Sequence, residues 1–128
     1  MSRIRVTGVD HVVIMTADVE RSLGFYVDQL GLEPVRVDEF RRGEVFFPSI
    51  RISATTILDL FPAGPDGKNV DHLCLTVDEI DLAAVADSGE FDVVSGPSEL
   101  FGAQGMGTAL YVRDPDGLVI ELRHYGTA

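Results

Sequence analysis

A line of sequence that occurs twice constrains this chain more than any other feature. Val-Asp-His-Val-Val-Ile-Met-Thr at residues 9–16 returns as Val-Asp-His-Leu-Cys-Leu-Thr at residues 70–76. The two copies place His11 and His72 at the same point of each repeat, roughly 60 positions apart, which is too long for a solenoid and indicates a duplicated module.

A second repeated pair places an acidic residue near the end of each half. Ile-Leu-Asp-Leu at residues 57–60 is answered by Val-Ile-Glu-Leu at residues 119–122, so that Asp59 corresponds to Glu121. A single histidine in a strand is more often structural than a ligand. Two histidines and two carboxylates at matching places in related modules are what a metal site on a pseudo-twofold axis requires, and the set predicts a divalent metal centre.

The chain is long enough for one domain but not for two. It has 128 residues, of which 45% are hydrophobic and 24% charged, the composition of an ordinary globular protein. No apolar run approaches the roughly 18 residues of a membrane span, and the amino terminus lacks the apolar stretch of a signal peptide. With Cys74 as the single cysteine, we expect a cytoplasmic protein without disulfides or membrane contact.

The charge balance bears on the partners. The formal net charge of −11 repels phosphate backbones, so nucleic acid is not an expected partner. A small-molecule ligand is expected instead, and the acidity is compatible with a cationic one.

Each half has the pattern of one strand, one helix and then three strands. In the first half, Asp18 is the expected N-cap of a helix that Gly31 ends. In the second half, Asp78 is the expected N-cap and Gly89 follows the helix. The expected strands are residues 9–16, 32–40, 44–53 and 54–61, then 70–77, 91–95, 108–113 and 118–125; the helices are residues 18–31 and 80–86.

The remaining segments are expected to be loops. Residues 62–69 have the richest turn composition, so the domain 1–128 divides into modules of about residues 7–61 and 70–126 joined by a 62–69 linker. Residues 96–107 hold four glycines and are expected to form a mobile loop that covers the site. Asp-Pro-Asp-Gly at residues 114–117 has the residues of a type I turn in order.

Two stretches give the chain a family resemblance. Asp10-His11 leads into Asp-Val-Glu-Arg-Ser-Leu-Gly-Phe-Tyr-Val-Asp-Gln-Leu-Gly at residues 18–31, and Tyr-Val-Arg-Asp-Pro-Asp-Gly-Leu-Val-Ile-Glu stands at residues 111–121. With them the chain resembles the vicinal oxygen chelate superfamily, which includes glyoxalase, bleomycin resistance proteins and extradiol dioxygenases. The resemblance implies an α+β fold of two βαβββ modules whose mixed sheets curl into an open barrel around a divalent metal.

The resemblance also implies a ligand set. His11, His72 and Glu121 match three metal-ligand positions, and Asp59 matches the fourth, which is a glutamate in glyoxalase I. Nitrogen and oxygen donors together admit zinc, nickel, manganese, cobalt or iron. Because aspartate is shorter than glutamate by about 1.5 Å, Asp59 could instead act through a bound water as a general base. A plain structural role as a hydrogen-bonding aspartate is the other reading.

Three kinds of function fit this pattern. The first is a lyase or isomerase in which the metal stabilises an enediolate while Asp59 and Glu121 flank the reacting carbon. The second is an extradiol-type dioxygenase, for which Tyr111 fits, although Gln104 stands where that signature expects a histidine. The third is a metal-free, drug-binding protein of the bleomycin-resistance kind.

Two arginines are candidates for substrate binding. Arg123 should share the face of Glu121, and Arg51 lies in phase with Asp59 on the neighbouring strand. Either could hold a substrate carboxylate or phosphate, or pair internally with an acid. Because each module leaves a sheet edge exposed, a homodimer is also expected.

Overall fold

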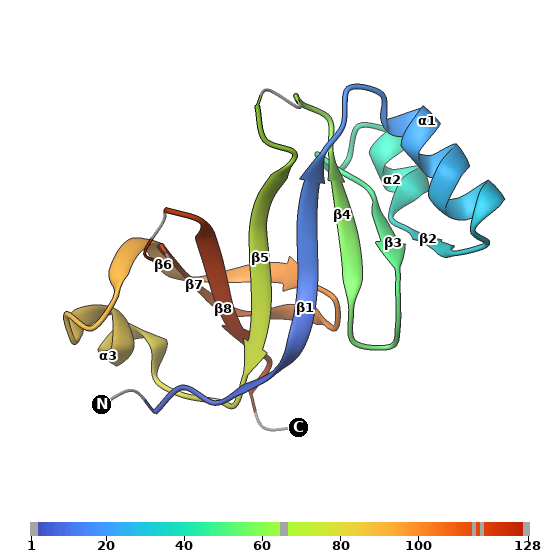
Figure 1. The fold of residues 1–128 in the computed structure, drawn as a ribbon. Coiled ribbons are helices and arrows are strands. Elements are labelled where there is room, and N and C mark those ends of the chain that lie inside the picture. Colours follow the sequence, from blue (N-terminus) through green and yellow to red (C-terminus); the bar gives the residue numbers. More distant parts are fainter. Residues whose placement is uncertain (1–2, 65–66, 114, 116, 127–128) are drawn as a thin grey trace.

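A curled sheet of eight strands forms the frame of the protein. The computed structural model describes residues 3–64, 67–113, 115 and 117–126. The strands run in the order β2-β3-β4-β1-β5-β8-β7-β6, so that β1 and β5 lie side by side at the centre (Figure 1). The strands are β1 Val6–Met15, β2 Glu33–Val35, β3 Ser49–Arg51, β4 Ile57–Phe61, β5 Val70–Val77, β6 Asp92–Gly102, β7 Gly105–Arg113 and β8 Val119–His124.

The two halves of the sheet have matching connectivity. In the first half β1 pairs with β4 in parallel, and in the second half β5 pairs with β8 in parallel. The central pair, β1 and β5, is antiparallel. The sheet curls without closing, which gives the α+β architecture expected from the sequence (Figure 1).

The helices are short and cover one face of each half. They are α1 Val19–Leu23, which continues as a π-helical turn at Gly24–Gln29, α2 Val37–Arg41 and α3 Leu82–Asp87. One apolar cluster forms beneath α1 and α2, and a second forms beneath α3. In each half the opposite face of the strands is free to carry the polar side chains of a site. No helix among the described residues is long and apolar enough to cross a membrane.

The caps of the first helical segment agree with the sequence prediction. Asp18 accepts a hydrogen bond from the Arg21 backbone nitrogen at 3.1 Å, which satisfies one free N–H of the first turn. Gly31 takes the left-handed conformation, with φ of 74°. The helix predicted in the second half, α3, differs from the prediction, because its N-cap is Asp81 and not Asp78.

The strand predicted over residues 32–40 is wrong after its first few residues. The strand β2 ends at Val35, Arg36 adopts a left-handed backbone with φ of 61°, and α2 follows. The helix is favoured because Val37 and Phe40 both pack into the first apolar cluster. The strand predicted over residues 44–53 is likewise shorter, since β3 covers Ser49–Arg51 alone.

The loop predicted over residues 96–107 is also wrong, because β6 and β7 pair as a hairpin through this segment. The glycines serve close packing. A Cβ on Gly102 would lie 2.6 Å from the Arg123 guanidinium, and one on Gly107 would lie 2.7 Å from the His124 carbonyl oxygen. Gly105, with φ of 101°, allows the turn.

Two predicted segments fall partly outside the described residues. The 62–69 linker includes residues 65 and 66, and the predicted turn at 114–117 includes residues 114 and 116.

Candidate metal centre

Four predicted ligands lie on two rungs of the central sheet that are two residues apart along β1. Along one rung, Asp59 on β4 is opposite Val13 on β1, which is opposite His72 on β5. Along the other rung, His11 on β1 is opposite Cys74 on β5, which is opposite Glu121 on β8. Residues two apart in a strand point to the same face, so the repeat in the sequence delivers all four side chains to one place within a single chain.

One carboxylate oxygen of Glu121 lies close to the Nε2 atoms of both histidines. Glu121 Oε1 lies 3.1 Å from His11 Nε2 and 3.0 Å from His72 Nε2. The ligand atoms of His11, His72 and Glu121 all lie within 4.8 Å of one another, and all three side chains are buried. Asp59 stands at the edge of this group, with Oδ2 3.8 Å from His11 Nε2.

The donor set fits a divalent metal. Ligands bound at about 2.1 Å to one ion are separated by roughly 3.0 to 3.4 Å for octahedral or tetrahedral angles. The His11–Glu121 and His72–Glu121 separations of 3.1 and 3.0 Å fall in that range. Two imidazoles and a carboxylate bind transition metals and leave positions open for substrate oxygens. Asp59 could reach such an ion directly or through a water.

Each histidine is oriented by the aspartate that precedes it. His11 Nδ1 donates to Asp10 Oδ2, and His72 Nδ1 donates to Asp71 Oδ2, both at 2.8 Å. Neighbours in a strand normally point to opposite faces, but Asp10 and Asp71 are the extra residues of two β-bulges in the β1–β5 pair. Such a partner leaves Nε2 to face the centre, as in metal-binding histidines.

Asp10 is part of a larger buried network. Its carboxylate also accepts hydrogen bonds from the Ala103 backbone nitrogen and the Tyr125 hydroxyl. Burial alone would raise the pKa of Asp10, but the bonds from His11, Tyr125 and Ala103 lower it overall. Burial disfavours the charged form of His11, yet its contacts with Asp10, Cys74 and Glu121 raise its pKa to about 12.

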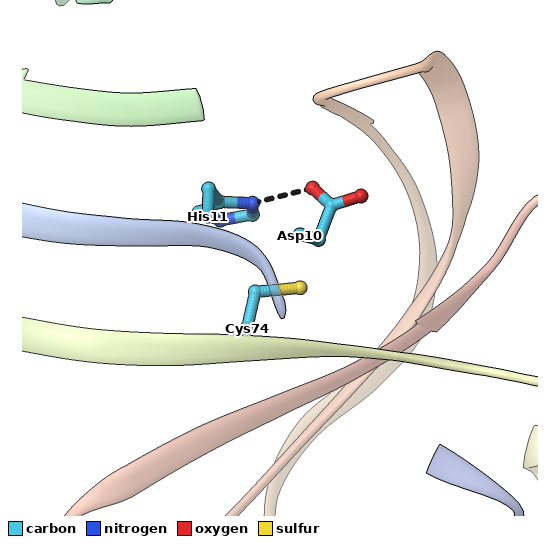
Figure 2. A group of neighbouring side chains, drawn as sticks. All are labelled: Asp10, His11 and Cys74. Carbon is cyan, nitrogen blue, oxygen red and sulfur yellow. Dashed lines mark hydrogen bonds and ion pairs between the residues drawn. The ribbon is translucent and has the colours of Figure 1, made fainter. Parts of the chain in front are cut away.

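Figure 2 shows Asp10, His11 and Cys74, which form a second group of possible ligand atoms. Asp10 already accepts hydrogen bonds on both oxygens, and burial raises the pKa of the Cys74 thiol to about 12. We therefore interpret this group as support for the His11 ring.

Arg123 binds the other carboxylate oxygen of Glu121, Oε2. Arg123 donates to Glu121 Oε2 through Nε at 2.9 Å and through Nη2 at 2.8 Å, and neither residue is exposed. Burial opposes ionisation of Glu121, but the bonds from His11 and His72 and the charge of Arg123 lower its pKa well below the usual range. The Glu121 carboxylate is thus ionised, with Oε1 left for the centre.

Asp59 has a weaker support. Ser49 Oγ donates to its Oδ1 at 2.6 Å, which leaves Oδ2 directed at the centre. Burial raises the pKa of Asp59, an effect that the His11 charge and the Ser49 hydrogen bond only partly oppose. Two carboxylates in one site with opposite pKa shifts suit different roles, one as a ligand and the other as a proton carrier.

The four side chains line a cavity of about 250 Å³ that also contains Tyr111, Phe61 and Phe101. The Tyr111 ring stands edge-on to His72, with ring centroids 5.4 Å apart. Burial and the nearby Glu121 raise the pKa of Tyr111, so its hydroxyl stays protonated and can donate.

The two arginines expected to bind substrate have internal partners. Arg123 Nη1 and Nη2 donate to the carbonyl oxygens of Leu100 and Phe101, in addition to Glu121. Arg51 donates to the Ala103 carbonyl oxygen at 3.0 Å. Neither lines the cavity, whereas Arg36, which sequence reasoning did not single out, does.

The fold agrees with comparisons to known proteins. Residues 8–122 match the Glyoxalase/Bleomycin resistance protein/Dioxygenase superfamily, and the chain belongs to this family. A virulence protein of Salmonella typhimurium is 28% identical over 91% of this chain and 83% of its own length. A probable lactoylglutathione lyase of Synechocystis is 30% identical over 88% of this chain and 91% of its own length.

A solved structure shows the same fold with a metal. The chain resembles the Mn(II)-bound glyoxalase from Novosphingobium aromaticivorans with a TM-score of 0.66 and 25% identity, over 94% of this chain. The chain spans 40% of the length of that protein.

Proposed function

We propose that this protein is a metal-dependent lyase or isomerase that moves a proton on a carbon next to a carbonyl group. The observation that carries the proposal is the convergence of His11, His72 and Glu121, with ligand atoms within 4.8 Å of one another in a cavity. The relative named as a probable lactoylglutathione lyase and the Mn(II)-bound glyoxalase support this class.

His11, His72 and Glu121 would hold the ion, with Asp59 beside it. A bound divalent ion would polarise the substrate carbonyl and stabilise negative charge on its oxygen. The other tasks fall to the protein side chains. Asp10 and Asp71 fix the histidine rings, and Arg123 keeps Glu121 ionised.

Asp59 is the proposed proton carrier. Its Oδ1 is held by Ser49, so its Oδ2 is the atom free to accept a proton from carbon and return it to a neighbouring position. The electron pair of the broken C–H bond passes into the carbonyl group of the substrate. Tyr111 would donate a hydrogen bond to a substrate oxygen, while Phe61 and Phe101 exclude water.

The first experiment measures metal content and proton exchange together. Untagged protein, His72→Ala and His124→Ala are analysed by elemental mass spectrometry after reconstitution with manganese, zinc, nickel, cobalt or iron. His124 is the matched control, because its side chain accepts a bond from the Gly126 nitrogen and does not line the cavity. We expect about one ion per chain in wild type and His124→Ala, and loss of it in His72→Ala.

Activity is then assayed with S-lactoylglutathione and with small hydroxy ketones, whose C–H exchange in D₂O is followed by NMR. Asp59→Asn should keep its metal and lose exchange by a factor of about 100 or more. Wild-type protein that binds no ion after reconstitution would overturn the proposal, and the metal-free binding reading would replace it.

A dioxygenase is the second candidate, because two histidines and one carboxylate with open positions are also the ligand set of ferrous oxygenases. Iron content together with oxygen consumption in the presence of a catechol would favour it. Against it, no third histidine lines the cavity in the described part of the chain. The homodimer stays a prediction, which light scattering would test.

A further inference from the structure

Arg36 stands out as the arginine of the cavity. It lines the same cavity as His11, His72 and Glu121, and among the described residues its guanidinium has no carboxylate partner. By contrast, Arg123, Arg41 and Arg42 all pair with glutamates.

Two phenylalanines position the Arg36 guanidinium. Its central carbon lies 4.2 Å from the centroid of the Phe101 ring and 5.9 Å from that of Phe47. A guanidinium that stacks by its face keeps its N–H groups, which lie in the plane at its edge, free to bind an oxyanion through two hydrogen bonds. The ring contacts hold the cation in the cavity, and among the described residues no hydrogen bond or ion pair occupies its donors.

The backbone of Arg36 indicates that its position is specified. It is the one non-glycine residue of the described chain with positive φ, 61°. That conformation is costly for a long side chain and easy for glycine or asparagine, and residues held in it cluster at functional sites. Phe101 is fixed in turn, because its carbonyl oxygen accepts a bond from Arg123.

The acidic charge of the rest of the protein favours a local cation at the place where an anionic ligand binds. The net charge is −11, and Asp59 and Glu121 line the same cavity. Such a field repels an anion. A half-buried, unpaired guanidinium compensates for this repulsion at one point of the wall and loses less hydration when an oxyanion binds.

We propose that Arg36 binds the carboxylate or phosphate group of the substrate, and that the substrate of this site is a small organic anion with an apolar segment. The inference rests on the proposed function for the role of the metal end of the cavity. The cavity of about 250 Å³ is below the roughly 300 to 1,000 Å³ of drug-sized sites, so a small acid, or the reacting end of a longer one, is what fits. Phe47, Phe61 and Phe101 would contact the apolar segment.

The test uses the whole 128-residue chain freed of metal by chelation, so that no ion can accept the anion. Calorimetry measures the binding of phenylacetate, of inorganic phosphate and of the neutral isostere phenylacetamide to wild type, Arg36→Asn and Arg42→Asn. Asparagine removes the charge but tolerates the left-handed backbone. Arg42, exposed and paired with Glu44, is the matched control.

We expect Arg36→Asn to lose about tenfold or more of the affinity for at least one anion, with phenylacetamide binding unchanged and with a Tm equal to or above that of wild type. Arg42→Asn should bind like wild type. Phenylacetate and phosphate distinguish a carboxylate from a phosphate substrate.

Three results would overturn the inference: equal losses for phenylacetate and phenylacetamide, no loss in Arg36→Asn, or no binding of either anion to wild type at millimolar concentration. A fall in Tm with unchanged anion binding would mean that Arg36 is structural. Because the measurement needs neither metal nor turnover, its failure is distinguishable from failure of the proposed lyase or isomerase activity.

Discussion

His11 and His72 occupy equivalent places in the two halves, but their supports differ. Asp10, which orients His11, is fully buried and also bonded by Tyr125 and Ala103. Asp71, which orients His72, has a side chain that is 35% exposed. The aspartate that orients the first histidine is therefore held by a network, whereas in the described part of the chain the Asp71 carboxylate bonds to His72 alone.

The carboxylates show the opposite asymmetry. Glu121, in the second half, is held by two donors of a buried arginine, whereas Asp59, in the first half, is held by the Ser49 hydroxyl. The rigid members, His11 and Glu121, thus come from different halves. The members with fewer supporting contacts are His72 and Asp59. For Asp59 this suits the proposed role, because a side chain that carries a proton must be able to move. The repeat accounts for the four residues, whereas the difference between them lies in the neighbours that hold them.

The largest effect is expected from Arg123→Met. The substitution leaves the Glu121 charge buried without its cation, and loss of one partner of a buried pair costs about 3 to 5 kcal/mol. Urea denaturation of the metal-free protein measures the free energy of unfolding. A loss in the free energy of unfolding below that of an ordinary surface substitution would show that Glu121 finds another partner. Arg123 would then not be what holds Glu121 in place.

Substitutions of Asp10 and Asp71 test the difference between the supports of His11 and His72. Asp10→Asn should lower metal affinity by about 10- to 100-fold, as loss of an outer-shell carboxylate does. Asp71→Asn should lower it less, because water can replace a partly exposed carboxylate. Calorimetric titration with Mn²⁺ measures both variants side by side. Equal losses in the two variants would contradict the asymmetry.

The sequence predicted the residues of this site but not the difference between the contacts that support them. The repeat predicted both histidines, both acids and their common face, because strand alternation depends only on spacing. The aspartate before each histidine was visible in the repeat, yet its contact depends on a β-bulge in each strand, and bulges follow from pairing with a distant partner.

Other features depended on packing that no local pattern records. The glycines of residues 96–107 read as a loop, although Gly102 and Gly107 are required by close approach to Arg123 and His124. The end of β2 before Arg36 had no local signal, since arginine does not favour a left-handed backbone. The cation that lines the cavity was therefore missed, and Arg51 and Arg123 were named in its place.

Ser49→Ala tests the lightly supported carboxylate. It removes the hydroxyl that donates to Asp59 Oδ1, so we expect a cost of about 1 to 2 kcal/mol, smaller than that of Arg123→Met. Ser98→Ala, at an exposed position of β6, should stay within about 0.5 kcal/mol of wild type. Urea denaturation of the three variants gives the order directly. A cost for Ser49→Ala equal to that of Arg123→Met would place Asp59 among the rigid members.

The smallest effect is expected at the exposed Arg41–Glu20 ion pair, which is compared with the buried Arg123–Glu121 pair. Arg41 donates to Glu20 through Nε at 3.1 Å and Nη2 at 2.7 Å, the same two donors that Arg123 offers to Glu121, but both side chains of this pair are more than half exposed. The hydrogen bonds from Arg41 lower the pKa of Glu20 below its ordinary value of 4.5. A lowered folded-state pKa adds stability above pH 4.5 that is lost as the pH falls through the folded value.

Solvent screens this pair, so Glu20→Gln should shift the Tm at pH 7 only slightly, and high salt should remove the shift. At pH 3, where the Glu20 contribution is reduced in wild type, the shift should be smaller than at pH 7. Thermal unfolding at both pH values and at low and high salt measures this. A salt-resistant shift as large as that of Arg123→Met would mean that the number of donors, and not burial, decides how firmly a carboxylate is held in this protein.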